Sequence, residues 1–238
     1  MNYILTAEGI SKTFDDKTIF SGLDIHLPEG KTVALLGPSG IGKTTLMNIL
    51  SGVMLPDRGK VTLCGEDITG KPGHISYMQQ KDLLLPYYTV LHNVALPLII
   101  KGVKKKEAME RARQYFDFFG LQGYENKYPS ELSGGMRQRA ALLRTYIQSD
   151  KVVLLDEPFG ALDAVTRAKM QKWYLEISKE LGLSTVIITH DTDEALILAD
   201  KVYVMGEGLR VIDIENKPDD FELTEEFIRL KKEIVSLL

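Results

Sequence analysis

The sequence predicts an α/β fold built around a mainly parallel sheet. Short apolar runs alternate with segments of helical periodicity along the 238 residues. The runs Val33–Leu36, Val152–Leu155 and Val186–Ile188 are rich in Leu and β-branched residues and are bounded by turn or polar residues, as expected of parallel strands covered on both faces. Each run is followed by polar or glycine residues, and ligands of open α/β sheets bind at the carboxyl ends of the strands.

Composition narrows the classes of protein further. Apolar residues make up 44% and charged residues 26%, which is ordinary for a globular domain, and a net charge of −4 gives no reason to expect nucleic acid as a partner. The single cysteine, Cys64, cannot form an intramolecular disulfide, which suits a reducing compartment, and we expect it to fill a small space in the core on a strand. Met1–Thr6 lacks a basic segment before a long apolar one, so no signal peptide is expected. No window approaches the ~20 apolar residues of a membrane helix.

The first thirty residues differ from the rest, because turn sequences divide them into short apolar stretches. Asp15-Asp16 and Pro28-Glu29-Gly30 are such turns, which predicts a small antiparallel sheet of short strands. Val33–Leu36 then begins the parallel sheet, and Thr45–Leu50 is expected to be helical.

Residues 83–149 are expected to form a helical subdomain inserted into a core of residues 1–82 and 150–238, within a single domain that spans residues 1–238. The candidate helices are Val90–Ile100, Lys106–Phe119 and Gly134–Gln148, separated by Gly102, Gly120 and Pro129. A basic run between the first two helices is interpreted as a solvated loop, with contact to anionic lipid headgroups as the alternative. This run consists of Lys101, Lys104, Lys105 and Lys106.

The C-terminal segment Thr224–Leu238 has the periodicity of an amphipathic helix. Its apolar face is expected to pack on the protein's own core. The residues on that face are Phe227, Leu230, Ile234 and Leu237.

The segment Gly37–Thr44 has the pattern of a phosphate-binding loop between a strand and a helix. Its glycines let backbone N–H groups converge on phosphate oxygens, and the helix N-terminus adds a positive dipole. Lys43 supplies a positive charge for the β- and γ-phosphates, and the Thr44 hydroxyl is a ligand for Mg²⁺. A plain glycine-rich turn would not explain a Lys followed by a Thr. The predicted phosphate-binding residues are Gly37, Pro38, Ser39, Gly40, Ile41, Gly42, Lys43, Thr44 and Thr45.

Two adjacent acids, Asp156 and Glu157, follow the apolar run Val152–Leu155. Neighbouring side chains point in different directions at the end of a strand. We therefore expect Asp156 to hold the Mg²⁺ shell and Glu157 to face an attacking water as a general base. An exposed acidic turn would explain this segment in isolation, but it becomes the weaker interpretation beside a phosphate-binding loop.

The segment Leu132–Arg139, with the sequence LSGGMRQR, is a second glycine-rich turn that opens a helix. Ser133 is a good N-cap residue, and the glycines Gly134 and Gly135 permit close approach of the backbone. A helix cap alone would explain Ser133 but not the two glycines. We interpret the turn as a second phosphate-binding element, one that serves the phosphate held by another copy of the chain.

These segments occur in the order seen in ATP-binding cassette (ABC) ATPases, which the sequence resembles over nearly its whole length. The resemblance rests on Gly37–Thr44, Gln80, Leu132–Gln138, Asp156-Glu157, Gly160–Asp163 and His190. It implies a P-loop NTPase core of the RecA type, with ATP and Mg²⁺ as ligands. It also implies a homodimer in which each ATP contacts the phosphate loop of one copy and the signature turn (Leu132–Gln138) of the other.

The same resemblance implies roles for further residues. Phe14 stands where an aromatic ring stacks on adenine, with a buried core aromatic as the alternative. Gln80 matches the glutamine that reaches Mg²⁺ and the attacking water, and its neighbour Gln79 is equally polar. His190 resembles the histidine that contacts the γ-phosphate, and Asp163 resembles the aspartate that crosses the dimer interface.

Longer segments resemble the nitrate/sulfonate/taurine-type importer branch, which also includes transporters of thiamine-pyrimidine precursors. These segments are Leu84–Val94, Glu157–Arg167 and Thr189–Ala195, and Met136 in the signature turn departs from the glutamine of many relatives without implying loss of activity. The likeness implies a peripheral protein on the cytoplasmic face of the membrane, with an integral permease and, indirectly, an extracytoplasmic substrate-binding protein as partners. The alternative is a soluble ABC ATPase of translation or DNA repair, although we see neither a second cassette nor a long coiled-coil insertion.

Overall fold

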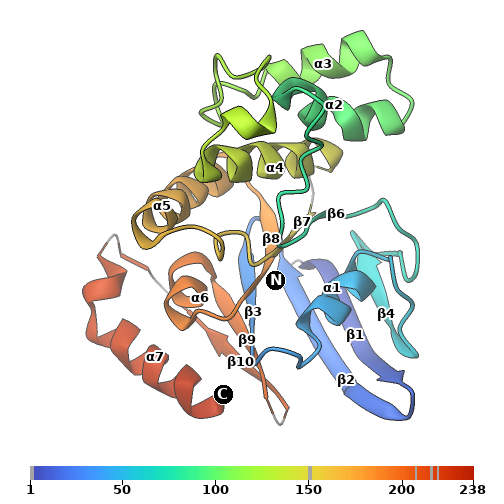
Figure 1. Ribbon diagram of the computed structural model, residues 1–238. Helices are drawn as coiled ribbons and strands as arrows, with labels where there is room; N and C mark the ends of the chain where they lie inside the picture. The colour runs from blue at the N-terminus through green and yellow to red at the C-terminus, as the bar shows by residue number, and fades with distance from the viewer. Residues whose placement is uncertain (1–2, 150–151, 207, 215–216, 219) are drawn as a thin grey trace.

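The computed structural model describes residues 3–149, 152–206, 208–214, 217–218 and 220–238. Two sheets form the lower part of the molecule as drawn, and a group of helices lies above them (Figure 1). No helix within the described ranges is both long and apolar enough to cross a membrane.

The larger sheet has six strands in the order β10-β9-β3-β8-β7-β6, and all neighbouring pairs are parallel except β9 with β10. Every residue of β3, β7 and β8 is buried, which confirms the prediction of parallel strands covered on both faces. The strands are β3 (Thr32–Leu36), β6 (Ser76–Met78), β7 (Val152–Asp156), β8 (Ser184–Thr189), β9 (Lys201–Met205) and β10 (Leu209–Asp213).

The smaller sheet is antiparallel, as predicted, with four strands in the order β2-β1-β4-β5. Its first two strands have 12 residues each and are not short, and the turn between them is made by Asp15 and Asp16, both at positive φ. The strands are β1 (Tyr3–Phe14), β2 (Lys17–Pro28), β4 (Arg58–Leu63) and β5 (Glu66–Asp67).

The prediction that Cys64 lies on a strand in the core is wrong. Cys64 is exposed and, with Gly65, makes the two-residue turn between β4 and β5. Both residues have positive φ, 50° and 81°, as hairpin turns of this length require. The buried apolar run therefore ends one residue earlier, at Leu63.

Four of the five helical predictions are confirmed, and one is wrong at its C-terminal end. The predicted helix Lys106–Phe119 begins at Lys105 and ends at Arg113, because the following residues form tight turns that direct Phe116 and Phe119 into the core. The helices are α1 (Lys43–Leu50), α2 (Val90–Ile100), α3 (Lys105–Arg113), α4 (Gly134–Gln148), α5 (Ala164–Leu181), α6 (Thr192–Leu198) and α7 (Glu225–Leu237), with 3₁₀ turns at Pro129–Glu131 and Phe221–Leu223.

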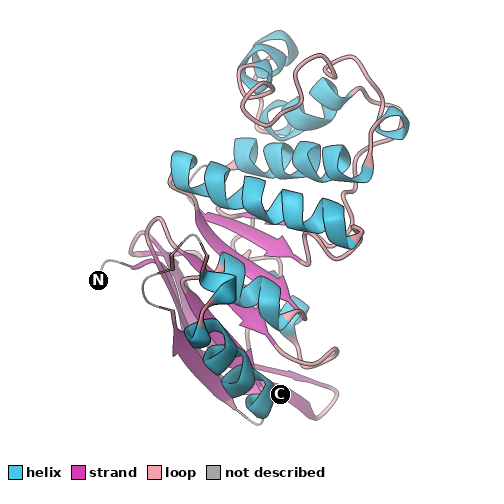
Figure 2. Cartoon of the chain, turned by 90° about the vertical axis from the view of Figure 1, so that its left-hand side faces the viewer, coloured by secondary structure: helices cyan, strands magenta, loops and turns pink. Residues whose placement is uncertain are grey.

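The long helices α4 and α5 lie side by side between the sheets and the remaining helices of the upper part (Figure 2). The strands of the parallel sheet contribute side chains to two apolar clusters, one on each face of the sheet, because side chains alternate between the faces of a strand. In β3, Ala34 and Leu36 join the cluster formed with α2 to α7, while Val33 and Leu35 join the cluster formed with α1 and the smaller sheet. The parallel sheet is thus fixed from both sides.

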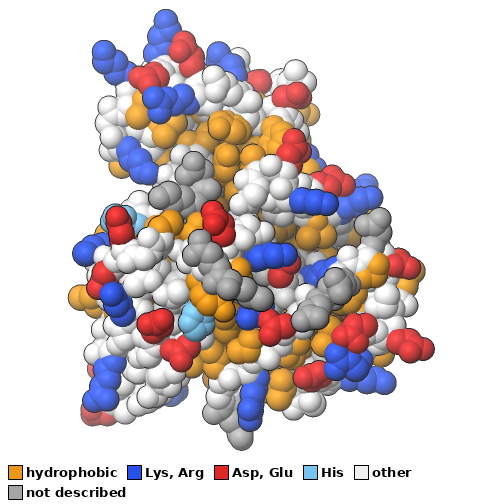
Figure 3. Space-filling view, turned by 180° about the vertical axis from the view of Figure 1, so that it is seen from behind, with side chains coloured by type: hydrophobic (Ala, Val, Ile, Leu, Met, Phe, Trp, Pro, Cys, Tyr) orange, Lys and Arg blue, Asp and Glu red, His pale blue; other side chains and the backbone are white. Residues whose placement is uncertain are grey.

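The surface carries charges of both signs, as the view from behind shows (Figure 3). Of the predicted basic loop, Lys105 and Lys106 are exposed but belong to the first turn of α3, so the loop interpretation is wrong for these two. Lys101 donates a hydrogen bond to the carbonyl of Gln148 at the end of α4.

The C-terminal helix α7 packs on the protein's own core, as predicted. Phe227, Leu230 and Ile234 are buried, and Leu237 is partly buried against the same cluster. The hydroxyl of Thr224 caps the helix by accepting a hydrogen bond from the Phe227 N–H.

Removing the most buried side chain of α7 is expected to destabilise the whole domain. Ile234 is 0% exposed, whereas its neighbour Val235 is 57% exposed. Ile234→Ala removes buried apolar atoms and leaves a cavity in the core. We therefore expect a loss of about 2–4 kcal/mol in the free energy of unfolding. Urea denaturation measures this loss, and Val235→Ala is the control, with a change below about 0.5 kcal/mol. Equal effects of the two variants would contradict the packing of α7.

Candidate functional site

The predicted phosphate loop connects β3 to the first turn of α1. Two of its glycines leave no room for a side chain. A Cβ on Gly37 would stand 2.7 Å from the carbonyl oxygen of Met205, and one on Gly42 would stand 2.5 Å from Cγ2 of Ile19. Gly42, which is the N-cap residue of α1, also has φ of 107°. The loop conformation is therefore tied to glycine at both ends.

The side chain of Lys43 folds back along the loop and is buried. Its Nζ donates to the carbonyl oxygens of Gly37 at 2.6 Å and Pro38 at 3.0 Å. Burial lowers the pKa of Lys43, while the negative charges of Glu157 and Asp156 oppose that shift. The ammonium group thus lies at the loop and faces two carboxylates.

Asp156 is the last residue of β7 and is buried beside the loop. Its Oδ2 accepts hydrogen bonds from the hydroxyls of Thr44 at 3.3 Å and Tyr77 at 3.0 Å. Burial raises the pKa of Asp156, and these hydrogen bonds together with the charge of Lys43 partly offset the effect.

Tyr77 contacts Asp156 from β6 and was not among the residues predicted from the sequence. Burial raises the pKa of the Tyr77 hydroxyl, so this group stays protonated and acts as a donor. The apolar run before Gln80 was the available signal, because it forms β6 at the edge of the parallel sheet next to β7.

Glu157 lies at the centre of a group of polar side chains. Its Oε2 accepts a hydrogen bond from Nε2 of Gln80 at 2.9 Å, and its Oε1 lies 3.1 Å from Nδ1 of His190. Its φ of 45° is unusual for a residue other than glycine and costs on the order of 1 kcal/mol. A backbone hydrogen bond of 2.9 Å from its N–H to the carbonyl of Ile188 holds it at the end of the sheet.

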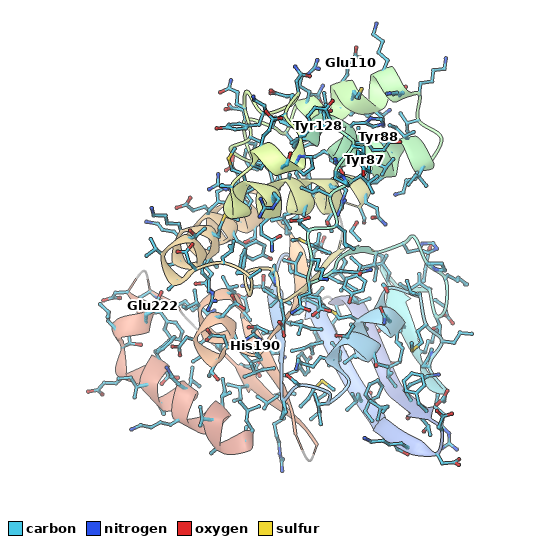
Figure 4. All side chains as sticks on the ribbon, in the orientation of Figure 1. Tyr87, Tyr88, Glu110, Tyr128, His190 and Glu222 are labelled. Carbon is cyan, nitrogen blue, oxygen red and sulfur yellow. The ribbon has the colours of Figure 1, made fainter. Side chains whose placement is uncertain are left out.

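Three elements supply this group. Glu157 follows β7, His190 follows β8, and Gln80 follows β6. Figure 4 shows His190 beside α6, in the lower half of the molecule, with Tyr87 and Tyr88 in the upper half near α2. Of the two neighbouring glutamines, it is Gln80 that contacts Glu157.

The signature turn lies at the start of α4 and packs against the start of α5. Ser133 caps α4, because its hydroxyl accepts a hydrogen bond from the Met136 N–H at 3.3 Å. A Cβ on Gly134 would meet Leu162 at 3.3 Å, and a Cβ on Gly135 would meet Thr166 at the same distance. The two glycines thus allow the two helix starts to approach each other.

Asp163 is exposed and caps α5, accepting a hydrogen bond from the Thr166 N–H at 3.1 Å. The N-termini of α4 and α5 are therefore neighbours, each with a polar cap on the surface. Gln138 of α4 donates a hydrogen bond to the carbonyl of Pro158. That contact links the signature helix to the residue that follows Glu157.

The alternative interpretation of Phe14 as a core aromatic is wrong. Phe14 ends β1 and is 42% exposed, with Nζ of Lys12 at 5.3 Å from the ring centroid. The ring therefore lies at the surface and not in the core.

A groove of about 350 Å³ separates the segment after Gln80 from the start of α4. Arg144 of α4 fixes the segment after Gln80, because its guanidinium donates hydrogen bonds to the carbonyls of Leu83 at 2.7 Å and Asp82 at 2.6 Å. Arg137 adds an ion pair with Asp82 at 3.3 Å. The lining residues are Gln80, Lys81, Asp82, Leu83, Gly134, Arg137, Gln138, Ala161 and Leu162.

A glycine-rich loop ending in Lys43 and Thr44, with an acid pair on a strand of the same sheet, defines the class of P-loop nucleotide-binding proteins. Residues 20–160 match the model of the ABC transporter family. The chain therefore belongs to the ABC transporter family.

Curated relatives are similar over almost the whole chain. The taurine import ATP-binding protein TauB of Pseudomonas aeruginosa (strain UCBPP-PA14) is 44% identical over 222 residues, covering 91% of this chain and 84% of that protein. The formylaminopyrimidine import ATP-binding protein ThiZ of Halalkalibacterium halodurans is 38% identical over 245 residues, covering 99% and 96%.

Solved structures of ABC transporter components have the same fold. The ATP-binding cassette MJ1267 superposes with a TM-score of 0.84 at 25% identity, covering 100% of this chain and 99% of that one. CbiO1 of Clostridium perfringens, part of the transporter complex cbiONQ, superposes with a TM-score of 0.81 at 27% identity, covering 96% and 94%.

Replacing the buried carboxylate of Asp156 by a neutral amide is expected to stabilise the fold at neutral pH. Burial raises the pKa of Asp156 above its ordinary value of 3.8, so the charged form costs folding free energy once the pH exceeds the folded pKa. Asp156→Asn should therefore unfold at a higher temperature than the unmodified protein at pH 7. The gain should shrink as the pH falls toward 3.8.

Thermal denaturation at several pH values measures this gain in stability, with Asp220→Asn at an exposed position as the control. A loss of stability at pH 7 would contradict the predicted cost of this charge.

Proposed function

We propose that the chain is the ATP-binding and ATP-hydrolysing subunit of an ABC importer. The observation that carries this proposal is the position of Glu157, with Gln80 and His190 hydrogen-bonded to its two carboxylate oxygens and Lys43 and Asp156 beside it. A carboxylate fixed on both sides next to a phosphate-binding loop suits the activation of a water molecule.

In this proposal ATP binds along the loop Gly37–Thr45. Backbone N–H groups and the N-terminus of α1 hold the phosphates, and Lys43 supplies a positive charge to the β- and γ-phosphates. Its amine exchanges the carbonyls of Gly37 and Pro38 for phosphate oxygens. The exposed ring of Phe14 stacks on the adenine.

The residues near the loop also fit Mg²⁺. The hydroxyl of Thr44 and the carboxylate of Asp156 are oxygen ligands 3.3 Å apart, and the amide of Gln80 is a third candidate ligand. No cluster of three His, Cys, Asp or Glu side chains suited to a metal occurs in the described part of the chain. This is in keeping with a cation bound through one carboxylate and substrate phosphates. When bound, Mg²⁺ would neutralise the charge that develops on the phosphates.

Hydrolysis then depends on three side chains. Glu157 accepts a proton from the water that attacks the γ-phosphate. Gln80 and His190 orient Glu157, and His190 also contacts the γ-phosphate. Because both hydrogen bonds hold Glu157 in one orientation, the water meets a base that is already in place.

A second copy of the chain completes the site in this proposal. Ser133, Gly134 and Gly135 present the N-terminus of α4 to the γ-phosphate held by the partner, and Asp163 crosses the interface beside them. The exposed caps of α4 and α5 support this arrangement, since a helix N-terminus with flanking glycines favours a phosphate. ATP binding closes the homodimer, and hydrolysis with product release reopens it.

An integral membrane permease is the proposed partner of residues 83–149, which form the helical subdomain of a domain with its core in residues 1–82 and 150–238. Gln80 and Leu84–Tyr88 carry the coupling, since they join the catalytic core to the helical subdomain that faces the permease. The subunit lies on the cytoplasmic face of the membrane and acts with an extracytoplasmic substrate-binding protein through the permease. The proposed cargo is a small solute of the nitrate/sulfonate/taurine or thiamine-precursor type, and the relatives are named as import proteins for taurine and for formylaminopyrimidine. A soluble ABC ATPase is not favoured, because both relatives are import proteins by name.

Glu157→Gln is expected to bind ATP and to hydrolyse it very slowly. Loss of the base should lower kcat by at least about 10²-fold, whereas the phosphate loop is untouched. The variant should accumulate as a dimer with ATP and Mg²⁺, measured by light scattering after gel filtration. A monomer at saturating ATP would contradict the completion of the site by a second copy.

Ser133→Arg is expected to abolish hydrolysis while the monomer still binds ATP. A bulky cation at the N-cap of α4 blocks the approach of the partner's phosphate and removes the cap. ATPase assays and binding of a fluorescent ATP analogue separate the two effects. Ser236→Arg on the exposed side of α7 is the control and should keep its turnover. Normal turnover of Ser133→Arg would refute the role of the signature turn.

A further inference from the structure

Two polar contacts join α5 to the segment that follows β8. Nη1 of Arg167 lies 3.7 Å from Oδ2 of Asp191, and Nε2 of Gln171 donates to Oε1 of Glu194 at 2.9 Å. The partners are four residues apart on α5 and three residues apart at the start of α6, so both contacts lie on facing sides of the two helices.

The first contact reaches the loop that precedes α5. Nη2 of Arg167 donates to the carbonyl of Leu162, next to Asp163, at 3.1 Å. On the other side, Oδ1 of Asp191 accepts the N–H groups of Asp193 and Glu194 at 2.9 and 3.2 Å and so caps α6. One guanidinium group thus holds the loop Gly160–Asp163 and the residue after His190 together.

The second contact is buried. Glu194 is 4% exposed and Gln171 is also buried. Burial raises the pKa of Glu194, and hydrogen bonds from Thr189 and Gln171 together with the charge of Arg167 oppose the shift. A buried carboxylate that lost these donors would be costly, so the contact fixes α5 and α6 in one arrangement.

Both neighbours of His190 belong to this network. The hydroxyl of Thr189 bonds Glu194, and its oxygen accepts the Asp191 N–H at 3.0 Å. The His190 side chain is 60% exposed, and its contact in the site is with Glu157. The position of the imidazole therefore follows from the backbone on either side of it.

We propose that Arg167, Gln171 and Glu194 are positioning residues. They fix the position of His190 relative to the loop Gly160–Asp163. This inference rests on the proposed function, in which Asp163 meets the second copy and His190 serves the γ-phosphate. Through the network, closure of the dimer at Asp163 sets the place of His190 against Glu157. Turnover then requires that the two helices move as one unit.

The test removes one contact and then restores it with the groups exchanged. Gln171→Leu should lower kcat about tenfold, as loss of a residue that orients a functional side chain typically does. The KM for ATP should stay within about twofold of the unmodified value. The double variant Gln171→Glu/Glu194→Gln rebuilds the hydrogen bond in the reverse direction and should recover most of kcat. Arg167→Met should resemble Gln171→Leu, and Arg229→Met on the exposed side of α7 is the matched control.

A second readout follows His190 itself in the protein without nucleotide. The NMR signals of the His190 imidazole ring at a fixed pH, assigned with His190→Gln, should change in chemical shift in Gln171→Leu and return in the double variant. Variants that lose only thermal stability, with kcat and these ring signals unchanged, would overturn the proposal. An unmodified protein without ATPase activity would overturn the proposed function instead, while the ring signals still decide whether the network positions His190.

Discussion

The site depends on the parallel pairing of β3, β8 and β7. In this register Leu36 lies opposite Thr189, and Ile188 lies opposite Asp156, so the three strands end at the same level. The phosphate loop, Glu157 and His190 are the next residues along the chain, and Asp156 is the last residue of β7. A shift of one residue in any pair would turn every side chain of that strand to the other face, and it would separate these groups. Burial on both faces of the sheet prevents such a shift, because the side chains of each of these strands pack into two apolar clusters, one on each face.

Glu157 shows how the sheet imposes a conformation that the residue itself disfavours. Its positive φ turns the chain immediately after β7, and the hydrogen bond to Ile188 keeps this turn attached to the sheet. The strain is maintained because the surrounding strands are fixed. As a result the carboxylate of Glu157 leaves the line of the strand and meets Gln80 and His190, while Asp156 stays beside Thr44.

Electrostatics adds a second constraint, because charged groups are buried on both sides of the phosphate loop. Burial shifts the pKa of Lys43 downward and that of Asp156 upward, and the opposite charges limit both shifts. Neither group is at its most stable in this arrangement, which is common where residues are placed for function and not for folding. A separate buried polar contact, between Gln171 and Glu194, joins α5 to α6, and Glu194 is also hydrogen-bonded to Thr189 beside His190.

The sequence alone predicted three strands of the parallel sheet, the helices α1, α2, α4 and α7, and the segments that carry the candidate site. The buried runs, the loop Gly37–Thr44 and the start of α4 at Gly134 are local patterns, and each follows from residues that are close along the chain. The tertiary structure decided what these patterns did not contain: the contact of Tyr77 with Asp156, the end of α3 at Arg113, the exposure of Cys64 and Phe14, and the link from Arg167 to Asp191. These features depend on residues far apart in the sequence, or on a competition between turn and helix that packing settles. Local propensity cannot encode them, because the partner that decides each one is brought near only when the sheet has formed.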